Sequence, residues 1–305
     1  MARAGLRVGA LALLSLALLG TEAQAGAWVQ SHGGYYLKLS ARRLDTDEEY
    51  DYRGRRRHIL EEHPAYADAA IRDVAVTAYA EYGLTHRTTA IADIAYKSLR
   101  ASRTAVLGGG LIQQQQRAET SGWADGWFSV RHSLLAAPLV LAIQAGLKLP
   151  LGYTSSPDSG GPGLGSGALD GEAWVMVGKS RHPLYFSAGL GYRRRRGPLH
   201  DEVVYAAELG GSRGRVLVKI GIDGLRNTSS PPDILGRTVV TPLPGGGGVL
   251  PRLEVGDQHV AKLSPALVFT VGRGLALEAQ ALHTLTGENA PSGTAYSLGL
   301  VLARP

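Results

Sequence analysis

The sequence predicts an all-β fold: a transmembrane antiparallel up-and-down β-barrel of about 12 strands. Apolar and polar residues alternate with a period of two in segment after segment, which is the spacing of a strand with one apolar face. After residue 25, no apolar run approaches the roughly 18 residues of a membrane-spanning helix, so only a closed barrel could cross a bilayer with its backbone paired. Long and short connections also alternate along the chain, which a soluble sandwich does not require.

The composition excludes several functional classes. The chain has 305 residues and no cysteine, which excludes disulfide scaffolds, thiol catalysis, iron–sulfur clusters and cysteine-based zinc sites. An apolar content of 44% argues against disorder. Lys and Arg number 32 against 26 Asp and Glu, and the basic residues are dispersed, so we expect no nucleic-acid partner.

Residues 1–25 are predicted to form a secretory signal peptide. Arg3 and Arg7 precede a short apolar stretch, and Ala23-Gln24-Ala25 supplies small residues for cleavage. The apolar stretch is too short to span a bilayer as a helix. We therefore expect an exported protein.

The alternation places the strands in order along residues 26–305. It is clearest in five segments: 35–42, 73–82, 139–148, 215–223 and 275–283. The predicted strands span 33–44, 70–82, 87–100, 123–135, 139–149, 172–179, 184–194, 201–210, 214–225, 258–271, 274–285 and 294–303. Glycine at many inward positions suits a barrel wall that bends.

The connections predict how the barrel is oriented. The long or polar ones are 45–69, 101–122, 150–171, 195–200, 226–257 and 286–293. The tight ones are 83–86, 136–138, 180–183, 211–213 and 272–273. Long and short connections therefore lie at opposite ends, with both termini at the short-turn end, as in bacterial outer-membrane barrels with periplasmic turns and extracellular loops.

The long connections are expected to be solvated loops. Residues 45–63 mix both charges, 113–116 are four glutamines, and 155–167 are rich in Ser, Gly and Pro. Loop 226–257 could instead fold into the lumen as a constriction. The run Arg193–Arg196 is expected to be a solvated rim, with binding of lipopolysaccharide phosphates as the alternative.

The inward-facing charges balance. By strand phase, the inward basic residues are Lys38, Arg42, Lys97, Arg131, Lys148, Arg193, Arg215, Lys219 and Lys262. The inward acids are Asp73, Glu81, Asp93, Asp125, Glu172, Glu202, Glu208, Asp223 and Glu278. Nine against nine predicts little ion selectivity, and it allows pairing between neighbouring strands. The pairs could fill a closed lumen or line a conducting one.

The sequence contains no convincing catalytic or metal site. His132 and Ser133 are neighbours on a strand and so point to opposite faces. Gly165-Ser166-Gly167 lacks the spacing of a nucleophile elbow, and Gly108–Gly110 lacks the lysine of a phosphate loop. His58 and His63 are expected to be solvated loop residues. We therefore expect no catalytic residue, no metal and no cofactor.

Several short motifs resemble a known family. They are Lys148–Gly152, Gly165–Gly167 with Asp170, Gly189–Arg193, Gly26–Trp28, Gly34–Lys38 and Tyr79–Thr85. Spread over most of residues 26–305, they resemble a family of outer-membrane transporters associated with the meta-cleavage pathway of phenol degradation, in particular its XagA-like members. The resemblance implies a barrel that moves small, often hydrophobic molecules. Unlike most such barrels, this sequence ends Leu302-Ala303-Arg304-Pro305 without the terminal aromatic residue read by the outer-membrane assembly machinery.

The function expected from these observations is passive passage of a small, often hydrophobic organic solute through an outer-membrane barrel. The expected partners are outer-membrane lipid, lipopolysaccharide, the assembly machinery during insertion, and the solute. The residues expected to line the solute path are Lys148, Asp170, Arg193, Lys219 and Glu208. The alternatives are a non-conducting barrel that acts through its extracellular loops and, more distantly, a lipid hydrolase.

Overall fold

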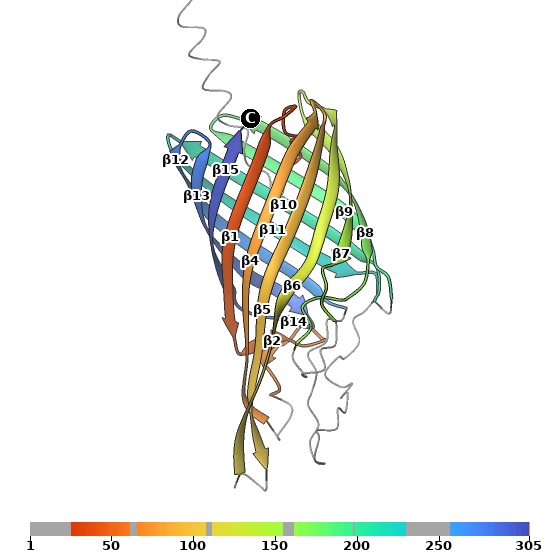
Figure 1. Ribbon diagram of the computed structural model, residues 1–305, viewed down its shortest axis with the longest axis vertical. Helices are drawn as coiled ribbons and strands as arrows, with labels where there is room; N and C mark the ends of the chain where they lie inside the picture. Colours follow the sequence, from red (N-terminus) through yellow and green to blue (C-terminus); the bar gives the residue numbers. More distant parts are fainter. Residues whose placement is uncertain are drawn as a thin grey trace, which may run out of the picture.

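The structure is a closed antiparallel barrel of twelve strands (Figure 1). It is a computed structural model that describes residues 26–61, 66–107, 112–154, 162–197, 199–229 and 257–304. The barrel strands are β1 (Tyr35–Thr46), β4 (Tyr66–Thr85), β5 (Thr88–Leu107), β6 (Ile112–Leu135), β7 (Val140–Pro150), β8 (Asp170–Arg181), β9 (Leu184–Arg194), β10 (Glu202–Arg213), β11 (Val216–Asn227), β12 (His259–Gly272), β13 (Leu275–Glu288) and β15 (Thr294–Arg304).

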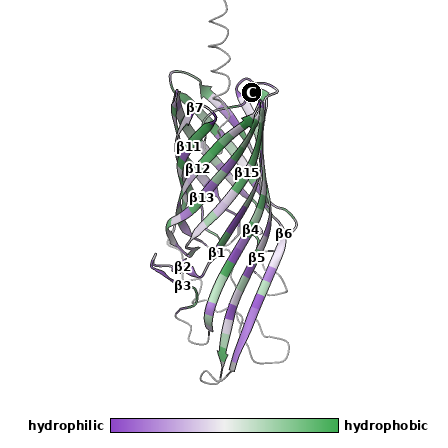
Figure 2. Cartoon of the chain, turned by 90° about the vertical axis from the view of Figure 1, so that its left-hand side faces the viewer, coloured by the Kyte–Doolittle hydropathy of each residue, from purple (hydrophilic) through white to green (hydrophobic). Residues whose placement is uncertain are grey.

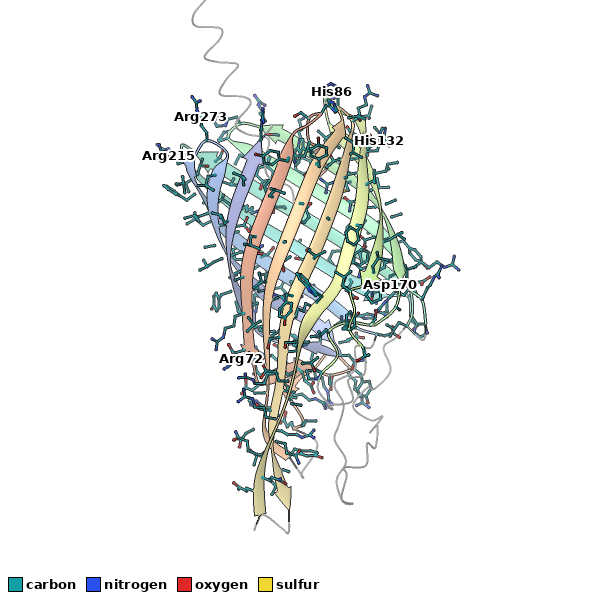
Figure 3. All side chains as sticks on the ribbon, in the orientation of Figure 1. Arg72, His86, His132, Asp170, Arg215 and Arg273 are labelled. Carbon is teal, nitrogen blue, oxygen red and sulfur yellow. The ribbon has the colours of Figure 1, made fainter. Side chains whose placement is uncertain are left out.

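Each strand pairs with its neighbours in sequence, and β1 closes the ring against β15. All twelve predicted strands are confirmed. The short turns gather at the end that carries the C-terminus, where Figure 3 labels His86, His132, Arg215 and Arg273; Arg72 and Asp170 lie toward the other end. In the predicted orientation, the end with the short turns is the periplasmic end.

The outer face of the barrel is apolar although it is exposed. Outward side chains such as Leu190, Val218 and Leu298 are more than half exposed, a pattern that a protein in water rarely tolerates over a whole sheet and that a barrel in a bilayer requires. Exposed aromatic side chains lie near both ends of this surface: Tyr82, Phe186 and Phe269 near the short turns, and Tyr96, Trp123, Tyr192 and Tyr296 toward the long loops. The described part of the chain has no helix long and apolar enough to cross a membrane.

Two connections expected to be loops contain strands, so those predictions were wrong. Within 45–69, β2 (Glu48–Tyr50) and β3 (Arg56–His58) form a small sheet with β14 (Ala290–Pro291), and β4 already begins at Tyr66. The segment 101–122 is mostly the continuation of β5 and β6, which project beyond the barrel (Figures 1 and 2). The alternation fails there because residues 113–121 are almost entirely polar and residues 101–107 mix polar and apolar side chains on each face.

Backbone pairing and charge hold this projecting hairpin together. The pairing of β5 with β6 continues without a break from Tyr96 opposite Trp123 to Leu107 opposite Ile112. Arg100 donates to Glu119 at 2.8 Å, and the Arg103 guanidinium stacks on the Tyr66 ring. The four glutamines therefore belong to a strand rather than to a loop.

Some predictions fall on residues outside the described ranges. These are the signal peptide 1–25, His63, Gly108–Gly110, the segment 155–161 of the third long loop, and 230–256 of the longest loop.

Candidate functional site

The N-terminal segment Gly26–Ser31 lies inside the lumen near the end with the short turns. Before β1, the backbone N–H of Gly34 donates to the carbonyl of Ser31 at 2.9 Å, and Gly33 takes a φ of 73°, so the chain reverses direction there. Gly33 and Gly83 are joined by a backbone hydrogen bond of 2.9 Å, which fixes this reversal to the end of β4. A Cβ on Gly83 would lie 1.8 Å from the carbonyl oxygen of Ser31, so only glycine allows this approach.

A buried polar network attaches the segment to β4, β5 and β6. Glu81, 1% exposed, accepts from the Gln30 amide at 2.6 Å and from Arg131 at 3.2 Å. Arg131 donates to the backbone carbonyl of Trp28 at 2.9 Å, and the backbone N–H of Gln30 donates to Thr89 at 2.8 Å. The pair Glu81–Arg131 thus binds two residues of the segment at once.

Apolar packing attaches the other side of the segment to β7, β8 and β9. Ala27 is fully buried against Ala142 and Met176. The Trp28 ring lies over Gly178, where a Cβ would come within 3.0 Å of it, and makes an edge contact with Tyr185. The segment therefore crosses the lumen from β4 to β9, covering half of the twelve strands at this level.

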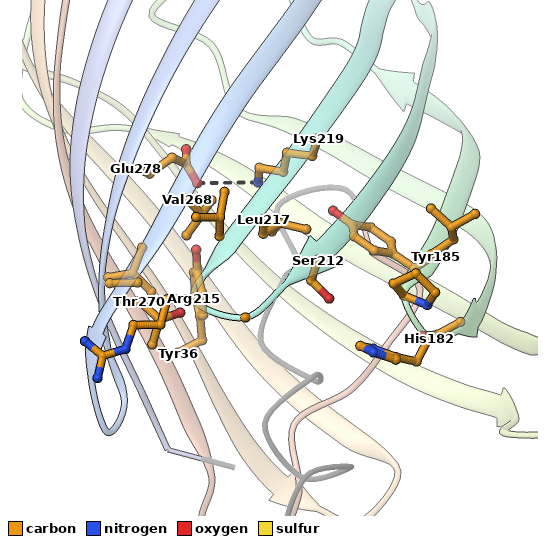
Figure 4. A pocket seen from close by; sticks show the side chains of 17 residues that line it. Tyr36, His182, Tyr185, Ser212, Arg215, Leu217, Lys219, Val268, Thr270 and Glu278 are labelled. Carbon is orange, nitrogen blue, oxygen red and sulfur yellow. Dashed lines mark ion pairs between the residues drawn. The ribbon is translucent and has the colours of Figure 1, made fainter.

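A cavity of about 110 Å³ lies beside this segment at the short-turn mouth of the barrel (Figure 4). We call it the vestibule. Its wall comes from β1, β11, β12, β13 and β15, from the ends of β8, β9 and β10, and from the turns that precede β9 and β11. The residues lining it include Tyr36, His182, Tyr185, Ser212, Arg215, Leu217, Lys219, Val268, Thr270, Ala276, Glu278 and Val301.

A cluster of paired charges closes the inner end of the vestibule. Lys219 lies 3.4 Å from Glu278 and 3.5 Å from Glu208, and Lys38 forms a second ion pair with Glu278. Tyr185 donates to Glu208 at 2.7 Å. Lys219 and Glu208, two of the predicted path residues, are therefore in contact, on neighbouring strands.

The other three predicted path residues lie in an outer cluster near the end with the long loops. Lys148 contacts Asp170 at 2.5 Å, and Arg193 contacts Glu202 at 2.8 Å. Arg195 joins the two pairs, since it lies 2.7 Å from Glu202 and 3.5 Å from Asp170.

The prediction of a solvated rim at Arg193–Arg196 is wrong for Arg193 and Arg195, whereas Arg194 and Arg196 are exposed. The side chain of Arg195 is only 6% exposed and that of Arg193 is 20% exposed, because both turn inward to the acids of β8 and β10. Asp201 supports this placement by accepting from the backbone N–H of Arg195 at 2.8 Å. Hydrogen bonds from Tyr192 and from that N–H hold the pKa of Asp201 below its usual range.

The third long loop packs onto the outer cluster. The Ser166 hydroxyl accepts a hydrogen bond from the Lys148 ammonium at 2.5 Å. This bond holds the loop against Lys148 and does not activate the serine as a nucleophile. Tyr153 donates to Asp125 and accepts from the backbone N–H of Gly167 at 2.9 Å. Burial, together with the bond to Asp125, raises the pKa of the Tyr153 phenol.

Between the two clusters the lumen is less tightly paired. Arg42 contacts Asp73 at 2.9 Å. Among the described residues, Lys97 and Lys262 have no ion-pair partner within 4.0 Å, although Lys262 lies within electrostatic reach of Asp73 and Asp223. Both lysines lie in the wall of the lumen and are only partly exposed.

His132 and Ser133 point to opposite faces of β6, as neighbours on a strand are predicted to do. His132 bonds Thr88 on the outer face, while Ser133 is buried and donates to the carbonyl of Leu135, so the two do not meet. His58 lies 3.5 Å from Asp47 in an exposed position. Among the described residues, no group of three or more His, Asp or Glu could hold a metal ion.

The sequence reasoning missed the N-terminal segment and Arg195. Trp28 and Gln30 stand in a stretch without alternation that ends in Gly33-Gly34, and this was the only signal that the chain turns back before the first strand. Arg195 follows the last residue of β9, where strand phase no longer indicates direction.

No protein-family model and no curated protein matches the sequence. Among solved structures, the COG4313 outer membrane channel from Pseudomonas putida F1 superposes with a TM-score of 0.62 at 15% identity, over 93% of this chain and 99% of that one. The translocator domain of the autotransporter NalP from Neisseria meningitidis gives 0.45 at 12% identity, over 97% and 94%. The Ralstonia pickettii toluene transporter TbuX gives 0.44 at 7% identity, over 90% of each chain. This chain has the fold of an outer-membrane β-barrel.

Proposed function

We propose that the protein is a passive outer-membrane channel for a small organic solute. The observation that carries the proposal is the arrangement of the periplasmic mouth: Gly26–Ser31 occupies one half of a charged lumen, and the vestibule occupies the other. A lumen built only for stability would not need a cavity lined by both charged and apolar groups.

The solute path runs between the two charge clusters. Lys148, Asp170 and Arg193 lie on it at the extracellular end, and Lys219 and Glu208 lie on it above the vestibule.

Residues 1–25 are removed on export, and lipid surrounds the apolar outer face. Lipopolysaccharide and the assembly machinery are the further partners of this proposal.

Single-channel conductance of the refolded protein in a planar bilayer tests the proposal. A heat-dependent shift in gel mobility first establishes that the barrel has formed. Discrete current steps, together with swelling of proteoliposomes in a small organic solute, are the expected result. A folded barrel that gives neither steps nor swelling contradicts it.

A non-conducting barrel that acts at the cell surface is the second candidate. The projection of β5 and β6 beyond the barrel favours it, because a channel has no need for a polar extension of this length. If this candidate is correct, the folded barrel gives no conductance, and removal of the projecting hairpin abolishes its function at the cell surface.

A further inference from the structure

The end of the barrel with the short turns carries exposed charge of one sign. The five turns and the strand ends that they join lie in segments 83–90, 132–142, 179–186, 211–218 and 270–277, and none of these segments contains an Asp or Glu. The Lys and Arg residues of these segments and of β15 are Arg87, Lys179, Arg181, Arg213, Arg215, Arg273 and Arg304. All of them are exposed, and within the described ranges none has a carboxylate oxygen within 4.0 Å. The positive charge of this end is therefore not neutralised by the protein itself.

An apolar groove of about 890 Å³ lies on the outer face of β1, β4, β5, β6 and β7. Small side chains leave the depression, and larger apolar side chains stand beside it. The small ones include Ala80, Ala90 and Ala145, and the larger ones include Tyr82, Phe128 and Leu147. Because this face of the barrel is apolar and exposed, we expect the groove to be filled by hydrocarbon chains of the bilayer.

The strand register places two of the cations at the edge of this groove. Arg304 lies opposite Tyr35 in the pairing of β15 with β1, and Tyr35 lies opposite Tyr82 in the pairing of β1 with β4. Side chains that are directly opposite each other have Cβ atoms about 5 Å apart. Arg87 lies in the turn that follows β4. Since tyrosines of membrane proteins gather at the level of the lipid headgroups, both arginines are close to the level of the phosphates.

The groove and its two arginines together match the chemistry of an anionic phospholipid. Arginine forms charge-assisted hydrogen bonds with phosphate, and basic side chains at a membrane surface favour lipids of net negative charge. We propose that the groove binds one anionic phospholipid, with its phosphate at Arg87 and Arg304 and an acyl chain along the alanines. In the predicted orientation, this lipid belongs to the periplasmic leaflet. The site does not depend on the proposed channel function.

Native mass spectrometry of the refolded protein, released from detergent micelles, tests the site. The probes are phosphatidylglycerol and phosphatidylcholine at equal concentration, which carry identical oleoyl chains and differ in the net charge of the headgroup. Phosphatidylglycerol is expected to form the first lipid adduct about tenfold more often than phosphatidylcholine. Equal amounts of the two adducts overturn the proposal.

Two pairs of arginine substitutions show where the headgroup lies. Arg87→Gln combined with Arg304→Gln is expected to reduce the phosphatidylglycerol adduct about tenfold, to the level of phosphatidylcholine. Arg181→Gln combined with Arg213→Gln is the matched control, because it removes two exposed cations from the same end on strands that do not line the groove. The control should keep the preference of the unsubstituted protein to within about twofold. The same loss in both pairs overturns the site.

A substitution in the groove tests the place of the acyl chain independently. Ala90→Leu fills the groove and is expected to reduce the adducts of both lipids about tenfold. Ala207→Leu adds the same side chain on β10, on the far side of the ring, and should leave the adducts unchanged. Each variant must first show the gel-mobility shift of a formed barrel, and equal adducts in the two variants overturn the proposal. A barrel that binds the lipid as expected but gives no current steps contradicts the channel and supports this site.

Discussion

Arg131 is the residue that ties the N-terminal segment to the barrel wall. It pairs with Glu81, donates to the Trp28 carbonyl and donates to Gln144 at 3.0 Å, with 1% of its surface exposed. Replacing Arg131 with methionine leaves a buried carboxylate without its cation, which costs about 3–5 kcal/mol. The expected loss appears in the free energy of unfolding by guanidinium in lipid.

Arg194→Met serves as the control for this prediction. Arg194 is exposed on the same barrel, so its loss should change the free energy of unfolding by no more than about 0.5 kcal/mol. Equal effects of the two substitutions would show that Arg131 has no special role.

Asp51 makes the stability of the turn between β2 and β3 depend on pH. It lies in the turn between β2 and β3 and accepts from the backbone N–H groups of Arg53 and Arg55, each at 2.8 Å. Burial acts to raise the pKa of Asp51, but the hydrogen bonds from Arg55 and Arg53 outweigh it and hold the pKa below the ordinary 3.8. A lowered folded-state pKa means that the stabilisation of this turn is complete above about pH 4 and is lost as the pH falls through the folded-state value.

Carbon-13 NMR of aspartate-labelled protein measures this titration directly, and Asp51→Asn assigns the signal. The expected midpoint lies below 3.8. A midpoint at or above that value contradicts the hydrogen bonding described.

At the scale of elements, Gly83 decides whether the N-terminal segment stays in place. Alanine there would put its Cβ 1.8 Å from the Ser31 carbonyl oxygen, and since that contact is with backbone, the segment must move. We expect Gly83→Ala to displace Gly26–Ser31 and to raise single-channel conductance.

The absence of cysteine allows a clean readout of this displacement. In an Ala27→Cys background the only thiol is fully buried, so it should resist a maleimide reagent until Gly83→Ala exposes it. Gly272→Ala is the matched control, because a Cβ there meets nothing within 4 Å. Labelling that is the same in both variants would contradict the prediction.

The sequence predicts strands far better than it predicts these contacts. Period-two alternation is a local property, so all twelve barrel strands could be found from it. The projecting ends of β5 and β6 lack this signal, because 113–121 is almost entirely polar and 101–107 mixes polar and apolar side chains on each face. The contact of Lys148 with Asp170 could be predicted from the sequence because both residues flank one loop. The position of Gly26–Ser31 could not be predicted, since it depends on contacts with six strands that are spread over about a hundred residues.

At the scale of the whole molecule, the lumen is electrically balanced. Strand phase assigns nine charges of each sign to the interior, but Arg215 lies exposed in the turn before β11, so that prediction was wrong. Asp170 and Arg195 add one charge of each sign, so the described interior holds nine basic and ten acidic residues and is balanced to within one charge. We expect a cation-to-anion permeability ratio within about twofold of unity. Reversal potentials measured in a salt gradient check it, and Glu278→Gln should move them toward anion preference.

The Gly26–Ser31 segment also has a consequence for the order of assembly. It precedes β1, and the ring closes by pairing β1 with β15, so the segment can enter from the periplasmic side after the wall is complete. Folding would then have two separable stages in time. The gel-mobility shift reports closure of the ring, and the loss of thiol reactivity at an Ala27→Cys position reports the later filling of the lumen.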